Sequence, residues 1–368
     1  MKKQNLTNNE RKRSIVVSGY YGYHNLGDDT ILEMICKDLA EDYELTVLSR
    51  RPSETLKEYS VRAIGRYDLR EIIRVISDAD LLISGGGTLL QDRSSVHSLL
   101  YYLLVLKIAQ QCSVPTMIYA AGIGPVIHRF SMKAISRILS KVNIISLRDR
   151  QSQKFIHKLS AEKGTILTAD PVLRMEVSAD SAVELFFTQN RLTDKKMFAV
   201  SLRKMNEKEQ RQMSILLDKV AALSGFVPVF ICMQESEDLQ TTLEVQKYMS
   251  QTHSVLLNKR VSGPDMAAIL KRMQCVIGLR LHALVIGSLA GIHLIGVDVD
   301  PKISAFLEEL DTELLYSMTD ITDEKTAECI VRIMSEPCKY DLTELKERSN
   351  RTKELVHAFF DQRESTDR

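Results

Sequence analysis

Residues 14–29 have the sequence SIVVSGYYGYHNLGDD, in which a short apolar run is followed directly by a glycine-rich turn and an acidic pair. The run 14–18 is small or β-branched and stops at Gly19, as expected for a buried strand. The glycines permit tight turning, and backbone N–H groups at the start of the following helix favour an anion. The turn does not match the G-x-G-x-x-G dinucleotide pattern, so it does not predict a nicotinamide cofactor.

The alternation of short strands and longer helices continues along the chain. In the first half, strands are predicted at 45–48, 81–84, 116–120 and 143–147, and helices at 28–40, 97–112 and 131–141. After a break, strands recur at 198–202, 227–232, 254–257, 275–278 and 293–297, and a final amphipathic helix at 342–361. Continuously apolar strands are typical of parallel sheets covered on both faces. The pattern predicts an α/β protein with two Rossmann-like domains facing across a cleft.

The break near 170–195 sets the expected domain organisation. We expect, in order, a basic disordered arm at 1–13, a first Rossmann-like domain at 14–177, a linker at 178–195, a second Rossmann-like domain at 196–340, and a C-terminal helix with a polar tail at 341–368. In such folds ligands bind beyond the carboxyl ends of the strands. The candidate functional residues are therefore those that directly follow a strand.

Composition excludes several classes of protein. The chain has 368 residues, of which 44% are hydrophobic and 26% charged, the balance of a soluble globular protein. Lys and Arg number 49 against 48 Asp and Glu, so no global field would attract nucleic acid. The apolar run 99–106 is too short to span a bilayer, and a cytoplasmic location is expected. The basic arm is either a solvated tail or a contact for anionic lipid at the inner face of the cell membrane.

Six cysteines without C-x-x-C spacing, and the lack of clustered histidines, predict neither a disulfide framework nor a metal site. The cysteines are expected to be small buried residues of a protein in a reducing compartment. Nothing in the sequence specifies an oligomeric state.

Two more glycine turns follow predicted strands. Residues 85–92 have the sequence GGGTLLQD, and residues 122–125 have the sequence GIGP. Three consecutive glycines have a high entropic cost in a folded chain, so a ligand approaching the bare backbone of Gly86 and Gly87 is the better interpretation than a simple connector. Gly124 should lie along the same edge of the sheet.

Arginines stand at the ends of three predicted strands, at Arg148, Arg203 and Arg280. At that position the guanidinium points into the ligand crevice, where it can bind a carboxylate or phosphate through two hydrogen bonds. Three such residues indicate a small, highly anionic ligand. The alternative is that they pair with local acids, such as Asp149 beside Arg148.

Further candidates lie at helix starts. His282 follows Arg280 by two residues, and we expect an acid–base role for it rather than that of a core histidine. Lys302 falls in the first turn of a helix opened by Pro301, where a cation opposes the helix dipole and so implies a bound anion. Asp28 and Asp29 either cap the first helix or bind a ligand.

Taken together, these motifs resemble those of the polysaccharide pyruvyl transferases, and most closely the CsaB type, which pyruvylates secondary cell-wall polysaccharide in Gram-positive bacteria. The resemblance covers roughly residues 14–310 and is carried in order by GYYGYxNxGD, GGGTLLQD, GIGP, SLRD, ADPVL, GLRLHA and DPKI. The family often has Gly-Asp-Glu where this chain has Gly27-Asp28-Asp29, which leaves the role of Asp29 open.

The resemblance implies a glycosyltransferase-B-like fold and phosphoenolpyruvate as donor, without a cofactor. It implies a lipid-linked acceptor, N-acetylmannosamine on N-acetylglucosaminyl diphosphoundecaprenol, and donor-site roles for Arg280, His282 and Lys302 in the second domain. Arg148 or Arg203 would complete the anion site, with Asp28 as acceptor ligand or proton acceptor. The remaining expected contacts, on the acceptor side in the first domain, are Gly22, Asn25, Gly27, Gly86, Gly87 and Gly124.

Two alternatives belong to other classes of function. A nucleotide-sugar glycosyltransferase on the same fold would recognise a base and release a nucleotide rather than inorganic phosphate. A non-catalytic sugar- or anion-binding module would keep its ligand affinity when His282 is replaced.

Overall fold

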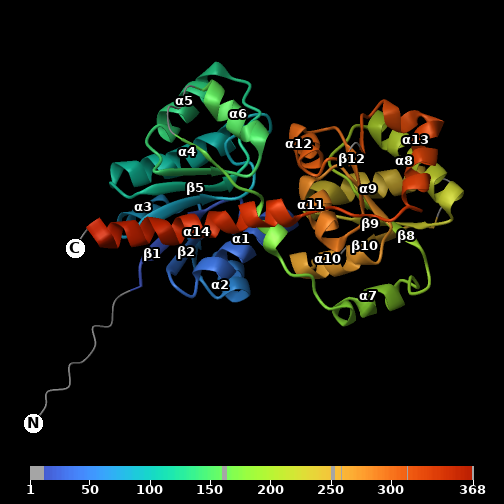
Figure 1. The fold of residues 1–368 in the computed structure, drawn as a ribbon, viewed down its shortest axis with the longest axis horizontal. Coiled ribbons are helices and arrows are strands. Elements are labelled where there is room, and N and C mark those ends of the chain that lie inside the picture. The colour runs from blue at the N-terminus through green and yellow to red at the C-terminus, as the bar shows by residue number, and fades with distance from the viewer. Residues whose placement is uncertain (1–11, 160–163, 250–252, 258, 313, 367–368) are drawn as a thin grey trace, which may run out of the picture.

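The computed structural model describes residues 12–159, 164–249, 253–257, 259–312 and 314–366. Within these residues the chain forms two parallel β-sheets, each covered by helices (Figure 1). Most of the predicted basic arm, residues 1–11, lies outside the described residues. None of the helices in the described part of the chain has both the length and the apolar run that crossing a bilayer requires.

The first sheet has seven parallel strands in the order β3-β2-β1-β4-β5-β6-β7. Their bounds are β1 Ser14–Ser18, β2 Glu44–Ser49, β3 Arg62–Gly65, β4 Leu81–Gly85, β5 Thr116–Ala121, β6 Ile144–Leu147 and β7 Ile166–Leu167. Both faces are buried, because Ile15 and Val17 of β1 lie in one hydrophobic core and Val16 lies in another. This is why the predicted strands are continuously apolar instead of alternating.

Helices cover both faces of this sheet. Their bounds are α1 Leu26–Leu39, α2 Pro52–Tyr59, α3 Leu69–Ser77, α4 Val96–Gln111, α5 Arg129–Leu139, α6 Arg150–Lys158 and α14 Thr343–Thr366. Figure 1 shows α4, α5 and α6 on one side of the sheet, and α1, α2 and the C-terminal helix α14 on the other. The C-terminal helix thus returns from the second half of the chain to pack on the first sheet, against α1 and β5.

The second sheet has six parallel strands in the order β10-β9-β8-β11-β12-β13. The strands are β8 Met197–Ser201, β9 Val227–Ile231, β10 Val255–Leu257, β11 Cys275–Gly278, β12 His293–Val297 and β13 Leu315–Tyr316. The helices are α8 Glu207–Ser224, α9 Glu235–Tyr248, α10 Gly263–Lys271, α11 Leu281–Ala290, α12 Pro301–Glu309 and α13 Glu324–Ile333. In both sheets the strand order reverses beside the first strand of the domain, and ligands of such sheets bind at this switch point.

The connection between the sheets contains short helices. Two 3₁₀ turns, η1 Pro171–Arg174 and η2 Asp180–Ala182, are followed by α7 Glu184–Gln189; a third turn, η3 Asp320–Thr322, lies in the second half. The sequence pattern does not predict the strands β3, β7 and β13. All three lie at sheet edges and have two to four residues, too few for a periodic signal.

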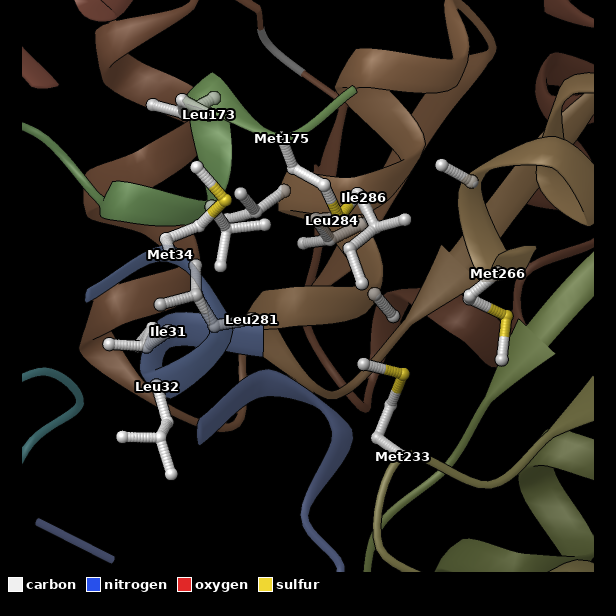
Figure 2. Close-up of a cluster of buried hydrophobic side chains, with 14 of the residues drawn as sticks. Ile31, Leu32, Met34, Leu173, Met175, Met233, Met266, Leu281, Leu284 and Ile286 are labelled. Carbon is white, nitrogen blue, oxygen red and sulfur yellow. The ribbon is translucent and has the colours of Figure 1, made fainter. Parts of the chain in front are cut away.

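An apolar seam joins the two domains. Figure 2 shows Ile31 and Met34 of α1 beside Met175, which follows η1, and beside Leu281 and Leu284 of α11. All of these side chains are buried in one continuous core that includes residues of both sheets. The seam therefore holds the starts of α1 and α11 and the approach to η1 close to one another. Of the candidate functional residues, Asp28 lies on α1 and His282 on α11.

Candidate active site

A cavity of about 460 Å³ lies between the two domains at the carboxyl ends of their strands. It is lined by residues that the sequence singles out, from both domains: Asn25, Asp28, Gly87, Arg148, Arg203, Arg280, His282 and Lys302. Segments separated by more than a hundred residues thus contribute to one site. The sequence predicts that Arg280, His282 and Lys302 face one cleft, and all three line this cavity.

Asn25 caps the start of α1. Its side chain accepts hydrogen bonds from the N–H groups of Gly27 (3.1 Å) and Asp28 (3.5 Å). Neither Asp28 nor Asp29 is the N-cap, so the capping alternative for the acidic pair is wrong; the helix begins two residues before the predicted start. With the cap supplied by Asn25, Asp28 is free to line the cavity. Asp29 faces another way and pairs with Arg260 at 3.3 Å.

Gly27 lets the imidazole of His282 approach the backbone of α1. A β-carbon built on Gly27 would lie only 1.9 Å from Nδ1 of His282. Gly87 has the same role for Asp28, because its β-carbon would lie 2.5 Å from Oδ1 of Asp28 and its φ of +67° favours glycine. These glycines are required by side chains of the site as well as by turn geometry.

His282 is paired with a residue that the sequence did not single out. Its Nε2 lies 3.3 Å from Oδ2 of Asp170, and the same carboxylate accepts a hydrogen bond of 3.0 Å from Arg148. Arg148 also donates to Thr88 at 2.9 Å and lies 3.6 Å from Asp149. Asp170 therefore joins the imidazole to the Arg148 guanidinium in one buried network.

The electrostatics of this network keep Asp170 ionised. Burial alone would raise the pKa of Asp170, but His282, Arg148 and the N–H of Val172 lower it to about 2. This charged carboxylate lies within ion-pair distance of Nε2 of His282 and favours one orientation of the ring, although the buried Nε2 forms no hydrogen bond to any described residue. Nδ1 then faces Gly27 at the start of α1.

Three other cations of the cavity each lie close to a carboxylate. Arg280 donates through Nε (3.1 Å) and Nη2 to the buried Asp238, while Arg203 and Lys302 both lie 3.4 Å from Asp300. The side chains of Arg280, Arg203 and Lys302 are 24%, 35% and 36% exposed, against 5% for Arg148. The first three can therefore still reach a ligand, whereas Arg148 is committed to its protein partners.

The remaining pKa shifts indicate an excess of positive charge near Lys302. Its enclosure lowers the pKa of Lys302; Asp300 opposes the shift, and the guanidinium groups of Arg148, Arg203 and Arg280 add to it. Enclosure likewise raises the pKa of Asp28, while His282, Lys302 and Arg148 oppose the change. An anion placed among these cations would relieve their mutual repulsion.

Besides Gly27, which packs against His282, three predicted contact residues do not line this cavity. Gly22 packs against Ser49 and Arg51 of the β2–α2 connection, and Gly86 lies against Ile31. Gly124 lines an adjoining cavity of about 290 Å³, which it shares with Arg148 and Lys302. Their glycine requirement comes from close packing and from φ values of +71° to +86°.

Sequence reasoning did not single out several residues of the cavity. Asp170 stands in the ADPVL motif, after β7, and this position was its only signal. Asp238 lies inside α9 and carries no motif at all. The polar wall on the first-domain side is made by Tyr20, Gln91, Ser94, Ser95 and Ser98, and Gln234 bridges the domains through Tyr20 (3.3 Å) and Asn25 (3.4 Å).

A family model described as polysaccharide pyruvyl transferase matches residues 25–301, which contain His282 and the cavity-lining arginines; Lys302 directly follows the matched range. The chain belongs to the polysaccharide pyruvyl transferase family. This membership makes the protein a transferase of polysaccharide biosynthesis and confirms the family resemblance. No curated protein matches it.

Solved structures with a similar fold have little sequence in common with this family member. UDP-N-acetylglucosamine 2-epimerase from Methanocaldococcus jannaschii has a TM-score of 0.65 at 10% identity, covering 95% of this chain and 99% of the epimerase. HepE from Anabaena, solved with UDP and glucose, has a TM-score of 0.63 at 9% identity, covering 95% and 100%. The epimerase of Rickettsia bellii scores 0.64 at 10% identity, covering 95% and 97%. These likenesses confirm the predicted fold of two Rossmann-like domains, the glycosyltransferase-B type.

Proposed function

We propose that this pyruvyl transferase forms a pyruvate ketal on a sugar of a cell-wall polysaccharide precursor, with phosphoenolpyruvate as donor and inorganic phosphate as product. The expected acceptor is the N-acetylmannosamine of a lipid-linked disaccharide, and the reaction takes place on the cytoplasmic side of the membrane. The observation that carries the proposal is the cavity in which His282, oriented by Asp170, lies among three ligand-accessible cations.

The cations suit a small ligand with two anionic ends. Phosphoenolpyruvate has a carboxylate and a phosphate on adjacent atoms, three negative charges in all at neutral pH. Arg203, Arg280 and Lys302 come from the second domain and have partly exposed side chains, so this domain is the donor side. Arg148, committed to Asp170 and Thr88, stays behind the ligand and supports the network. The hydroxyl-rich wall of the first domain, with Asp28, is the acceptor side.

The chemistry needs one proton delivered and two hydroxyl protons removed. His282, as imidazolium, protonates the methylene carbon of the donor and leaves an oxocarbenium-like centre at the adjacent carbon. One sugar hydroxyl forms a bond to that carbon, the bond to the phosphate oxygen breaks, and a second hydroxyl closes the ketal. Of the two hydroxyl protons, one restores the imidazolium and the other leaves with phosphate. Asp28, beside the imidazole, is the candidate for accepting a hydroxyl proton.

The released product separates this reaction from its main rival. Incubation with phosphoenolpyruvate and a synthetic disaccharide acceptor should release inorganic phosphate and add a pyruvate ketal to the sugar, as seen by mass spectrometry. The rival is a nucleotide-sugar glycosyltransferase, an activity suggested by a structure of similar fold that was solved with UDP and glucose. Such an enzyme would release a nucleotide from a UDP-sugar and no inorganic phosphate. That second result would end the proposal.

Replacement of the proposed acid tests its role directly. We expect His282→Ala to keep the fold and to lower kcat by about 10²–10⁴, the usual contribution of a general acid. The measurement is phosphate release under saturating substrates, with circular dichroism to check the fold. His293→Ala, which replaces another buried histidine of the same domain outside the cavity, is the matched control and should keep its activity. Near-normal turnover by His282→Ala would reject the assignment.

Asp170 acts through His282 and is therefore a positioning residue. Asp170→Asn should lower kcat by about 10²-fold with little change in KM, because the ring loses its charged partner. Asp38→Asn, which breaks the buried pair with Arg174, is the control for a purely structural loss and should keep both kcat and KM. An equal loss in the two variants would contradict the role.

A further inference from the structure

One long segment of the first domain contains no acidic residue. Between Arg93 and Arg148 the sequence has no Asp or Glu, although the chain as a whole has 48. The same segment has seven Lys or Arg residues, at 93, 107, 129, 133, 137, 141 and 148. In a chain of net charge +1 this is a strong local concentration of positive charge. The segment forms the neighbouring helices α4 and α5.

The outer side of these helices also exposes large apolar side chains. Leu100 and Leu104 of α4 are 41% and 46% exposed, and Ile127 and Phe130 at the start of α5 are 60% and 66% exposed. Leu100, Leu104 and Lys107 follow one another at helical spacing, as do Phe130, Lys133 and Arg137 on the next helix. We call these residues, Leu100, Leu104, Lys107, Ile127, Phe130, Lys133 and Arg137, the α4–α5 face.

The basic residues of this face have no acidic partners. Within the described residues, Lys107, Lys133 and Arg137 take part in no ion pair. Some exposed arginines elsewhere are paired within their own helix, as Arg74 is with Glu71 on α3 and Arg211 with Glu207 on α8. The charge of the α4–α5 face is therefore uncompensated and is available to an external anionic surface.

The face lies beside the mouth of the cavity. In a parallel α/β sheet each helix begins at the carboxyl edge of the preceding strand, which here is the edge that faces the second domain. Ser95 caps α4 and, with Ser98, lines the cavity; the turn of Gly124 that leads to Ile127 lines the adjoining one. Figure 1 shows α4 and α5 together on the side of the sheet away from α14.

We propose that the α4–α5 face docks the protein on an anionic phospholipid bilayer. Leu, Ile and Phe side chains enter the headgroup region, and Lys and Arg side chains contact lipid phosphates, the arrangement of interfacial amphipathic helices. The docked orientation places the cavity mouth at the membrane surface, where a lipid-linked sugar can enter. The inference goes beyond the proposed function, because docking does not depend on which group the enzyme transfers.

Charge and apolarity together favour a membrane over other partners. Nucleic acid would use the positive charge and leave four large apolar side chains without a partner. A symmetric dimer through this face would set the same uncompensated cations against one another. A bilayer with anionic headgroups matches both properties at once.

The test measures binding of the full-length protein to vesicles of phosphatidylcholine alone or with about one-third phosphatidylglycerol, by co-sedimentation. We expect binding only to the anionic vesicles, weakening as salt rises. Lys133→Gln with Arg137→Gln should lower the partition coefficient about 25-fold, at about fivefold for each charge. Ile127→Ser with Phe130→Ser should lower it at least about tenfold. Matched controls outside the first domain, Lys195→Gln with Lys208→Gln and Ile215→Ser with Leu223→Ser, should bind as the wild type does.

Three results would overturn the inference: a wild type that binds neither kind of vesicle, binding that survives in both α4–α5 variants, and a dimer that these variants dissociate without any vesicle binding. The basic arm is present in every variant, so it cannot produce the expected difference. Phosphate release with a soluble acceptor should be unchanged in the α4–α5 variants. If the wild type docks as expected yet releases no phosphate from phosphoenolpyruvate, the proposed function fails and the docking inference stands.

Discussion

At the scale of single residues, the site depends on side chains that can come close only where a neighbour is small. The imidazole of His282 occupies the space that a β-carbon on Gly27 would take, and Asp28 does the same beside Gly87. The three arginines of the cavity and Lys302 are each held by a carboxylate, so their positions are set before a ligand arrives. Such preorganisation is the main source of electrostatic stabilisation in enzymes.

Gly27→Ala tests this packing. Alanine would favour helix α1 by about 1 kcal/mol, so intrinsic propensity alone predicts no loss of stability. The new β-carbon, 1.9 Å from Nδ1, must instead displace the ring of His282. We expect a fall in kcat of about 10²-fold, the cost of misplacing a reacting group by about an ångström. The measurement is phosphate release.

Gly164→Ala is the control for this change, because a β-carbon there meets nothing within 4 Å. It should have wild-type kcat. If Gly27→Ala kept full activity as well, the close approach of the imidazole to α1 would have no part in catalysis.

At the scale of elements, helix starts do most of the positioning. Asn25 caps α1, Arg280 precedes α11 and Asp300 caps α12, so three helix N-termini direct their first turns into the cleft. Helix N-termini carry partial positive charge, which adds to that of the arginines and Lys302. The C-terminal helix α14 has a different role, because it packs across the opposite side of the first sheet.

The contribution of α14 to stability can be measured. Phe360 is 5% exposed and packs against Tyr43, with ring centroids 4.9 Å apart. Phe360→Ala should lower the free energy of unfolding by about 3–5 kcal/mol, the range for truncating a buried aromatic ring. Thermal unfolding followed by circular dichroism gives the difference. Glu354→Ala on the exposed side of the same helix should change it by less than about 0.5 kcal/mol. Equal effects would mean that α14 is not an integral part of the first domain.

At the scale of the whole molecule, the two domains are joined by the apolar seam and by an ion pair across a second cavity of about 280 Å³. Arg260 of the second domain contacts Asp29 at 3.3 Å and Glu58 at 2.9 Å in the first. Burial raises the pKa of Asp29 to about 7, although Arg260 opposes the shift. This carboxyl group is therefore partly protonated near neutral pH.

The raised pKa makes a prediction for stability against pH. The folded state holds the Asp29 proton between about pH 4 and 7 while the unfolded chain has lost it, so this residue lowers stability as pH rises through that window. The side chain of Asp29→Asn cannot ionise. The free energy of unfolding of this variant, relative to that of the wild type, should therefore rise by on the order of 4 kcal/mol from pH 4 to 7 and stay constant above that range. Thermal midpoints across this pH range give the comparison. Glu58→Gln removes the exposed partner of Arg260, and its stability relative to the wild type should not change with pH in this way. If the difference in stability between Asp29→Asn and the wild type were the same at every pH, the raised pKa of Asp29 would be contradicted.

Much of the fold and part of the site could be predicted from local sequence. Buried parallel strands need apolar side chains on both faces, so runs such as 14–18 and 275–278 mark them directly. Strand ends in such sheets converge on one edge, so Arg203, Arg280, His282 and Lys302 could be grouped without coordinates. The roles of these residues in the reaction stay predictions.

Only the tertiary structure decided which groups pair with which. Asp170 and His282 are 112 positions apart and meet because η1 and α11 pack in the same seam, and Arg280 finds Asp238 because α9 lies beside α11's start. Asn25 is the N-cap of α1, whereas Asp28 lines the cleft and Asp29 pairs with Arg260. Strand and helix periodicity depends on neighbours within a few residues, whereas ion pairs depend on distances that the whole packed chain determines.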